Sequence, residues 1–236
     1  MLQEHFRSHP LIIGFSNRYI YHSQLILKKN PGTDPAGLSS DAGVFRENVA
    51  GVVEPGPEGE SWINPQEADQ VANLAANLVT SHPNSSIGVV TPFKAQKFKI
   101  QGLLDARGIS TERILVDTAH AFQGDERDLM IFSPVVSVSA GTDPGLKKRM
   151  DGAATWIENP PNVTNVALTR ARDALYIVAN FTYLNSRGSN RILGQLSKYC
   201  NDIEELRTKG GGRVELYSWL VLQAWESKVL PLPDVD

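Results

Sequence analysis

Two arginines two positions apart, Arg170 and Arg172, are the side chains of this chain whose possible chemistry is clearest. They lie in VTNVALTRARDALYIVAN, residues 163–180, where a helix-compatible segment runs into an apolar strand at 175–178. Arginine is always ionised, and its planar guanidinium can donate two hydrogen bonds to one phosphate. Helical residues follow one another at about 100°, so we expect these two arginines on nearly opposite sides of a helix. One would face a phosphate and the other would brace the fold; the alternative is an amphipathic helix with two solvated arginines.

A second stretch with phosphate chemistry is TAHAFQGDERDLMIF, at residues 118–132. Gly124 permits a turn in which no side chain obstructs the approach of main-chain amides to a phosphate. Gln123 offers both a donor and an acceptor. Glu126 by itself has the character of an ordinary surface acid, and Asp128 is expected to order the loop.

A third group of polar residues follows two short apolar segments. The apolar run at 87–91 ends in Thr91 and is followed by Pro92 and Phe93, with Gln96 one turn later. Thr118 follows the run at 114–116. Hydroxyls and backbone amides at the turn from a strand to a helix are ready donors to phosphates. The sequence therefore predicts a second anion-binding surface, formed by these residues.

Three motifs in fixed order carry a family resemblance: EHFRSHP at residues 4–10, FQGDERD at 122–128 and NVALTRAR at 165–172. The chain resembles the second RecA-like lobe of a superfamily 1 helicase, in the branch typified by the nonsense-decay and Dna-type nuclease-helicases. The resemblance extends from about residue 2 to residue 180, and the last two motifs match at near-identity.

The resemblance implies that Arg7 and Arg170 are catalytic arginine fingers, which reach across a lobe interface to the γ-phosphate of ATP. An arginine finger contributes about 10³ to 10⁵ in rate. For Arg7 the alternative is an ion pair with Glu4, which would contribute a few tenths of a kcal/mol at most. The family's ribose acceptor corresponds to Glu126. The implied nucleotide-binding set is Gln123, Gly124 and Glu126, and the implied set that holds single-stranded nucleic acid is Thr91, Pro92, Phe93, Gln96 and Thr118.

Other parts of an ATPase site are missing from the sequence. It contains no GxxxxGK[ST] loop to cradle phosphates, and no upstream strand ending in an acidic pair to hold a metal. By resemblance, ATP and Mg²⁺ are bound mainly by a first RecA-like lobe of the same protein, expected before Met1. We therefore expect the chain alone to be inactive as an ATPase. The alternative is a non-catalytic nucleic-acid-binding or docking module that retains the lobe's fold.

The order of elements predicts an α/β fold: a three-layer sandwich with a mainly parallel RecA-like sheet and helices on both faces. Functional residues should gather at the carboxyl ends of the strands. The expected strands are 44–53, 87–91, 114–116, 129–136 and 175–178. The expected helices are 10–27, 65–79, 94–106, the segment before Arg170, 189–207 and 214–226, with loops at 30–43 and 137–161.

Composition limits the class of protein. The chain of 236 residues suits a lobe at 1–185 and a C-terminal helical extension at 186–236, the latter a candidate start of a downstream domain. Its single cysteine, Cys200, excludes an intrachain disulfide, and a cytoplasmic location is expected. No signal peptide and no run near the ~18 apolar residues of a membrane span is present. His5 and His9 lack an evident third ligand, so no metal site is predicted.

The net charge of −3 does not by itself indicate nucleic-acid binding. Residues 94–113 nevertheless carry a local charge of +3, which includes Lys94 and Lys97. A basic face along a phosphate backbone and a solvated helix face both explain this segment. Trp156, expected in the loop at 137–161, is compatible with stacking on a base, although packing is the commoner role.

Overall fold

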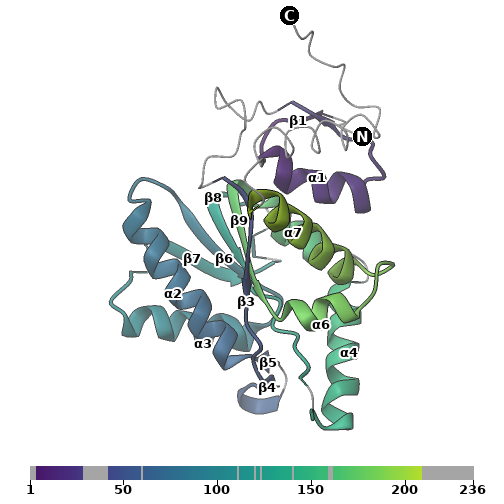
Figure 1. The fold of residues 1–236 in the computed structure, drawn as a ribbon. Helices are drawn as coiled ribbons and strands as arrows, with labels where there is room; N and C mark the ends of the chain where they lie inside the picture. Colours follow the sequence, from purple (N-terminus) through teal and green to yellow (C-terminus); the bar gives the residue numbers. More distant parts are fainter. Residues whose placement is uncertain are drawn as a thin grey trace, which may run out of the picture.

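The computed structural model describes residues 4–28, 42–59, 61–110, 112–119, 121–122, 124–139, 141–158 and 162–208. Gln123 and the helix expected at 214–226 lie outside these residues. Figure 1 shows a central sheet with helices on both sides.

The centre of the molecule is a five-stranded sheet in the order β3-β9-β8-β6-β7. Every neighbouring pair in it is parallel. The strands are β3 (Gly43–Asn48), β6 (Ile87–Thr91), β7 (Ile114–Thr118), β8 (Arg127–Phe132) and β9 (Ala171–Ala179). β6 and the last four residues of β8, Leu129–Phe132, are covered on both faces and are mostly apolar, as expected for buried parallel strands.

Helices cover both faces of the sheet, and each face has its own apolar core. One face packs against α2 (Pro65–Ser81) and α3 (Lys94–Ala106). The other face is covered by α1 (Pro10–Tyr19), α5 (Asn162–Thr169) and α7 (Ile192–Thr208), with α4 (Pro144–Glu158) and α6 (Phe181–Ser186) beside them. The predicted three-layer α/β sandwich with a parallel RecA-like sheet is confirmed.

Short elements complete the described chain. They are β1 (Glu4–His5) with β2 (Ile26–Leu27), the hairpin of β4 (Glu54–Pro55) and β5 (Trp62–Ile63), and the 3-10 turn η1 (Pro57–Gly59). In Figure 1, β1 and α1 lie at the end of the sheet opposite to the β4–β5 hairpin, α4 and α6. Among the described residues, no helix has the length and apolar character needed to cross a membrane.

Local signals fix several helix ends as predicted. Asn64 caps α2, since its side chain accepts a hydrogen bond from the Glu67 amide at 3.1 Å, and Pro65 occupies the first turn. Helix α3 ends at Ala106, and Gly108 follows in the left-handed region with φ +71°.

The predicted loop at 137–161 is wrong over most of its length, because it contains α4. The Asp143 side chain accepts a hydrogen bond from the Leu146 amide at 3.0 Å at the start of this helix. Met150, Ala154 and Ile157 are fully buried at helical spacing. The apolar period of this helix is present in the sequence, although prolines flank the segment on both sides.

Strand and helix limits also differ from the expectations. The strand expected at 44–53 ends at Asn48, the one expected at 129–136 runs from Arg127 to Phe132, and the helix expected at 10–27 ends at Tyr19. Helix α7 packs on the common core, where the Tyr199 hydroxyl donates to the Leu11 carbonyl at 2.6 Å. The proposed division of the chain at residue 185 stays a prediction.

Candidate functional site

The candidate residues lie at two opposite ends of the sheet. Thr91 and Thr118 are register partners at the carboxyl ends of β6 and β7. Glu126 and Arg170 each immediately precede a strand, β8 and β9 respectively, and so lie at the amino end. The predicted site residues therefore do not share one end of the sheet, because the FQG segment crosses from the end of β7 to the start of β8.

An arginine–carboxylate cluster occupies the amino end of the sheet. A guanidinium nitrogen of Arg7 lies 2.5 Å from one Glu126 carboxylate oxygen, and Nε of Arg172 lies 3.4 Å from the other. Arg172 also lies 3.5 Å from Asp128. The Glu126 side chain is only 13% exposed, whereas that of Arg7 is 61% exposed. We call Arg7, Glu126, Asp128 and Arg172, which are joined by these ion pairs, together with Arg170 in the adjoining turn before β9, the arginine cluster.

The ion pair considered from the sequence, between Arg7 and Glu4, is replaced by the pair with Glu126. Glu4 lies 3.5 Å from Lys28 on the neighbouring strand segment instead. The sequence separation between residues 7 and 126 hid this contact, because it depends on the FQG segment returning to the amino end of the sheet.

Arg170 lies in the turn between α5 and β9. Its backbone carbonyl accepts a hydrogen bond from the Arg127 amide at 3.0 Å, which aligns β8 with β9. Its Nε donates to the Val166 carbonyl at 3.3 Å, and within the described residues its guanidinium forms no ion pair with a carboxylate. Arg170 is thus partly buried, and in the described part of the chain no carboxylate lies within ion-pair distance of it, although its charge favours the ionised form of Asp125.

The helical argument that placed Arg170 and Arg172 on opposite sides is wrong. Helix α5 ends at Thr169, and Arg172 is the second residue of β9. The two side chains are separated by strand geometry and by the turn, because the helix ends before it reaches either arginine. Arg172 nevertheless braces the cluster, through its contacts with Glu126 and Asp128.

The acids around Arg170 are kept ionised by their neighbours. A hydrogen bond from Arg127 lowers the pKa of Asp125, and the charge of Arg170 acts in the same direction. Partial burial opposes ionisation of Asp128, but hydrogen bonds from the Ser86 amide and hydroxyl, at 2.8 and 2.7 Å, lower its pKa overall. Asp128 therefore ties the start of β8 to the start of β6, which is an ordering role.

Gly124 has φ +95°, and a Cβ atom there would meet no heavy atom within 4 Å. The backbone conformation, and not a lack of space, is the reason for a glycine at this position. The residue is exposed beside the cluster, so its backbone is open to an approaching ligand.

At the carboxyl end, the predicted nucleic-acid residues are partly below the surface. Thr91 is fully buried, and its hydroxyl oxygen lies 3.5 Å from the Phe93 amide that donates to it. Gln96 is also fully buried and bonds to the backbone of Asn64. In this conformation, neither the Thr91 nor the Gln96 side chain presents a surface to a nucleic acid. Pro92 and Thr118 are partly exposed, whereas only 9% of Phe93 is exposed.

A buried polar network behind this turn was not anticipated as a unit. One Glu67 carboxylate oxygen accepts hydrogen bonds from the Ser133 hydroxyl at 2.5 Å and from the Val135 amide at 2.8 Å. The Gln96 amide nitrogen donates to the Ser133 hydroxyl at 3.1 Å. Complete burial raises the pKa of Glu67 to about 8, although the bonds from Ser133 and Val135 act the other way. The Asn64–Glu67 capping signal pointed to the helix start, but nothing local indicated that Glu67 is buried.

Val135 in this network has φ +71°, a strained conformation for a β-branched residue. Its amide donates to Glu67 and its carbonyl accepts from the Asn64 side chain at 3.3 Å. These two bonds hold the chain in this conformation directly after β8. The network thus fixes the loop after β8 to the starts of α2 and α3.

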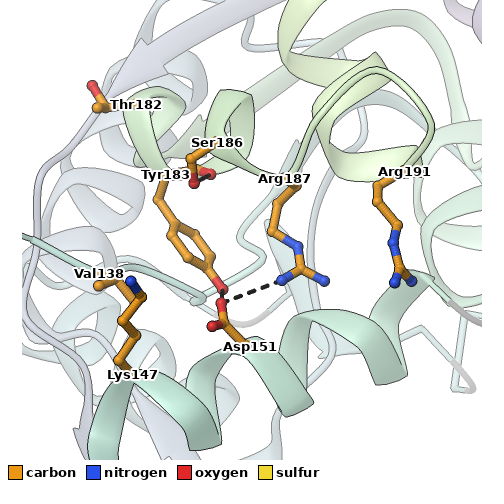
Figure 2. A pocket seen from close by; sticks show the side chains of 8 residues that line it. All are labelled: Val138, Lys147, Asp151, Thr182, Tyr183, Ser186, Arg187 and Arg191. Atoms are coloured by element: carbon orange, nitrogen blue, oxygen red, sulfur yellow. Dashed lines mark hydrogen bonds and ion pairs between the residues drawn. The ribbon is translucent and has the colours of Figure 1, made fainter. Parts of the chain in front are cut away.

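A polar hollow of about 490 Å³ lies between α4 and α6 (Figure 2). It is lined by Val138, Lys147, Asp151, Thr182, Tyr183, Ser186, Arg187 and Arg191. Arg187 lies 2.8 Å from Glu158 and 3.2 Å from Asp151, and the Tyr183 hydroxyl donates to Asp151 at 2.9 Å. Burial raises the pKa of Tyr183, and the hydrogen bond to Glu158 raises the pKa of Arg187. These contacts attach α4 to the segment that follows β9.

Comparison with known proteins identifies the family to which the chain belongs. The family described as an AAA domain matches residues 1–182. The chain is 30% identical over 209 residues to the 5'-3' DNA helicase ZGRF1 of Mus musculus, covering 87% of this chain and 10% of that protein. It is 30% identical over 200 residues to the probable helicase senataxin of Homo sapiens, covering 82% and 7%.

A third relative is the putative regulator of nonsense transcripts 1 of Takifugu rubripes, 28% identical over 191 residues, covering 76% of this chain and 16% of that protein. The chain thus spans between 7% and 16% of the length of these three relatives. The matches agree with the parallel sheet and with the three motifs, all of which contribute residues to the arginine cluster. The chain belongs to the superfamily 1 helicases, in the branch of the nonsense-decay and Dna-type nuclease-helicases.

Proposed function

We propose that this chain is the C-terminal motor lobe of an ATP-dependent DNA or RNA helicase. Arg170 carries this proposal, because it is a partly buried arginine without an ionic partner in the described residues. A partly buried guanidinium without a close carboxylate is well placed to bind an anion. A γ-phosphate at the amino end of the sheet would supply that anion.

Arg7 is proposed as the second finger, held ready by Glu126. Because the Arg7 side chain is 61% exposed, its pair with Glu126 contributes no more than about 1 kcal/mol. Contact between Arg7 and a phosphate of the nucleotide would therefore need to offset only about 1 kcal/mol to separate Arg7 from Glu126. The ribose hydroxyl would then donate to Glu126, which keeps Arg172 as a neighbour at 3.4 Å.

The described residues at this end of the lobe are suited to bind the phosphates of ATP, but they do not offer a site for Mg²⁺. Arg7, Arg170 and the open backbone at Gly124 are suited to phosphate, and Gln123 is proposed to join them. Among the described residues, no group of three or more His, Cys, Asp or Glu could hold a metal ion. We therefore propose that a first RecA-like lobe supplies the phosphate loop and the metal ligands.

At the opposite end, Pro92, Phe93 and Thr118 are proposed to contact single-stranded nucleic acid. Thr91 and Gln96 are proposed to act through the shape of the turn, since their side chains are buried. Lys94 is exposed beside the turn, while Lys97 is paired with Asp117 at 2.8 Å. Lys94 is therefore the better candidate for non-specific attraction to phosphates.

The test compares the chain alone with a protein that also contains the first lobe. The chain alone should show no ATP turnover above background, with or without DNA or RNA single strands. In the two-lobe protein, Arg170→Ala should lower turnover by about 10³-fold or more, and Arg7→Ala should lower it strongly. Both variants should change single-strand affinity by less than about threefold.

Arg107→Ala is the matched control, because Arg107 pairs with Asp69 at 2.6 Å on the outer side of α2 and α3. It should leave turnover unchanged. Turnover by the isolated chain that disappears in Arg170→Ala would contradict the proposal. A loss confined to nucleic-acid affinity in the two-lobe variants would favour a binding or docking module without a motor.

A further inference from the structure

Helix α4 presents an exposed tryptophan next to the turn that follows β6. The Trp156 side chain is 48% exposed. Its ring centroid lies 5.8 Å from that of Phe93, with the two rings tilted by 38°. We call Thr91, Pro92 and Phe93, which end β6 and lead into α3, the TPF turn. Phe93 is nearly buried, so Trp156 forms the outer layer of an aromatic pair whose inner member belongs to this turn. Packing uses one side of Trp156 and leaves about half of it open.

The same face of α4 also carries a contact between a cation and an aromatic ring. Arg149 precedes Trp156 by seven residues, which places both on one side of the helix, about 10.5 Å apart along its axis. The Arg149 guanidinium lies over the Trp62 ring of β5, 5.2 Å from its centroid. The contact of α3 with β5 brings this hairpin to the start of α3. The TPF turn, β5 and α4 thus adjoin one another at the carboxyl end of the sheet (Figure 1).

Helix α4 carries two acids and three cations, and one of the cations, Lys147, lines the same hollow as Asp151. Its acids, Asp151 and Glu158, are both paired with Arg187 on the side of the hollow in Figure 2. Its cations Lys147, Lys148 and Arg149 are exposed, and within the described chain none of them forms an ion pair. The accessible charge of the helix is therefore positive.

We propose that α4 extends the single-strand track, with Trp156 as a stacking platform for a base and Arg149 as a contact to the adjacent backbone. Exposed aromatic rings alternating with cations are what sequence-tolerant binding of single strands requires, since every base has a face that can stack. A site for an acidic protein would use the cations equally, but it would not need an open ring face. This proposal rests on the proposed function, because it extends the same nucleic-acid surface beyond the TPF turn.

The test measures binding of a fluorescein-labelled 12-nucleotide oligothymidylate and its uridine counterpart to the 236-residue chain, by anisotropy at a fixed salt concentration. Trp156→Ala should weaken binding about five- to 150-fold, and Trp156→Phe by less than about threefold. Phe6→Ala is the control, because Phe6 is an equally exposed aromatic residue, 62% exposed, at the opposite end of the sheet. Arg149→Gln should reduce the slope of log K against log[salt] by about 0.7.

A ligand-side comparison keeps the test independent of any folding defect in Trp156→Ala. An oligonucleotide of the same length with abasic sites should bind the unaltered chain more weakly by a similar factor. It should bind Trp156→Ala with little further loss, because the stacking partner is already absent.

The outcomes separate the two proposals. If the unaltered chain binds neither oligonucleotide, the nucleic-acid surface of the proposed function is wrong and this extension is wrong with it. If the unaltered chain binds but Trp156→Ala binds equally well, only the role of α4 is overturned, and an acidic protein becomes the better partner for its cations. An equal loss in Phe6→Ala would also overturn the assignment.

Discussion

Replacing Glu67 by glutamine should alter the pH dependence of stability. Glu67 is completely buried in the network behind the TPF turn, and its described hydrogen-bond partners, Asn64, Ser133 and Val135, are all uncharged. No positive charge among these partners compensates an ionised carboxylate. Burial therefore raises the pKa of Glu67 to about 8, from an ordinary value near 4.5.

The sign follows from proton binding in the two states. Between about pH 4.5 and 8 the folded chain keeps the Glu67 proton and the unfolded chain releases it. Stability from this group is therefore complete below the unfolded pKa, and falls by up to about 1.4 kcal/mol per pH unit as the pH rises. The loss levels off above about pH 8, at roughly 3 to 5 kcal/mol.

Urea unfolding at a series of pH values from 5 to 9 measures this effect. Glutamine is neutral throughout, so the stability of Glu67→Gln relative to the unaltered chain should increase across pH 5–8 and then stay constant. Taking this difference cancels the titration of every other group. Glu54→Gln, at an exposed glutamate of β4, is the control and should show no such trend.

A constant difference between Glu67→Gln and the unaltered chain from pH 5 to pH 8 would refute the reasoning. It would show that Glu67 is already ionised inside the fold, or that water reaches it. A trend of the opposite sign would require a positive partner for the carboxylate.

Two further changes test the packing at the carboxyl end of the sheet. Arg187→Ala should lower the free energy of unfolding by about 3 kcal/mol, because it leaves the Glu158 carboxylate, 2% exposed, without its main partner. Arg107→Ala, at an exposed ion pair, should lower it by less than about 1 kcal/mol. Equal losses for the two variants in urea unfolding would contradict this difference between a buried and an exposed ion pair. Gly51→Ala should cost about 1 to 3 kcal/mol, because its Cβ would lie 1.9 Å from the Asn64 amide oxygen. Gly102→Ala, in a helix with open space around it, should instead stabilise by about 0.5 to 1 kcal/mol in the same assay.

The parts of the fold that were predictable are those with a strong local signal. The strand at residues 87–91 and the helix that begins at Pro65 were predicted correctly, because apolar runs, caps and glycines act over a few residues. The contact of Arg7 with Glu126 could not be predicted in this way. It depends on which end of the sheet the FQG segment reaches, and that is decided by the order of the strands.

The arginine motif shows how a predicted site can rest on wrong geometry. Its resemblance identified Arg170 and Arg172 as a phosphate-facing and a bracing residue, but a helix was assumed to carry both. The chain changes from helix to strand between Thr169 and Ala171. Arg172 reaches Glu126 and Asp128 because β9 pairs with β8 in parallel register, a property of the sheet that no local pattern contains.

The short strand β6 joins the arginine cluster at one end of the sheet to the TPF turn at the other. Asp128 bonds to Ser86 at the start of β6, so the arginine cluster is tied directly to that strand. At its other end β6 leads into Thr91 and the TPF turn, about 16 Å away for a five-residue strand. Because β6 is buried and bonded to β7 and β8, it cannot lengthen or slip without breaking the central sheet. We therefore expect any displacement of the arginine cluster toward a nucleotide to move the TPF turn with it as a rigid body.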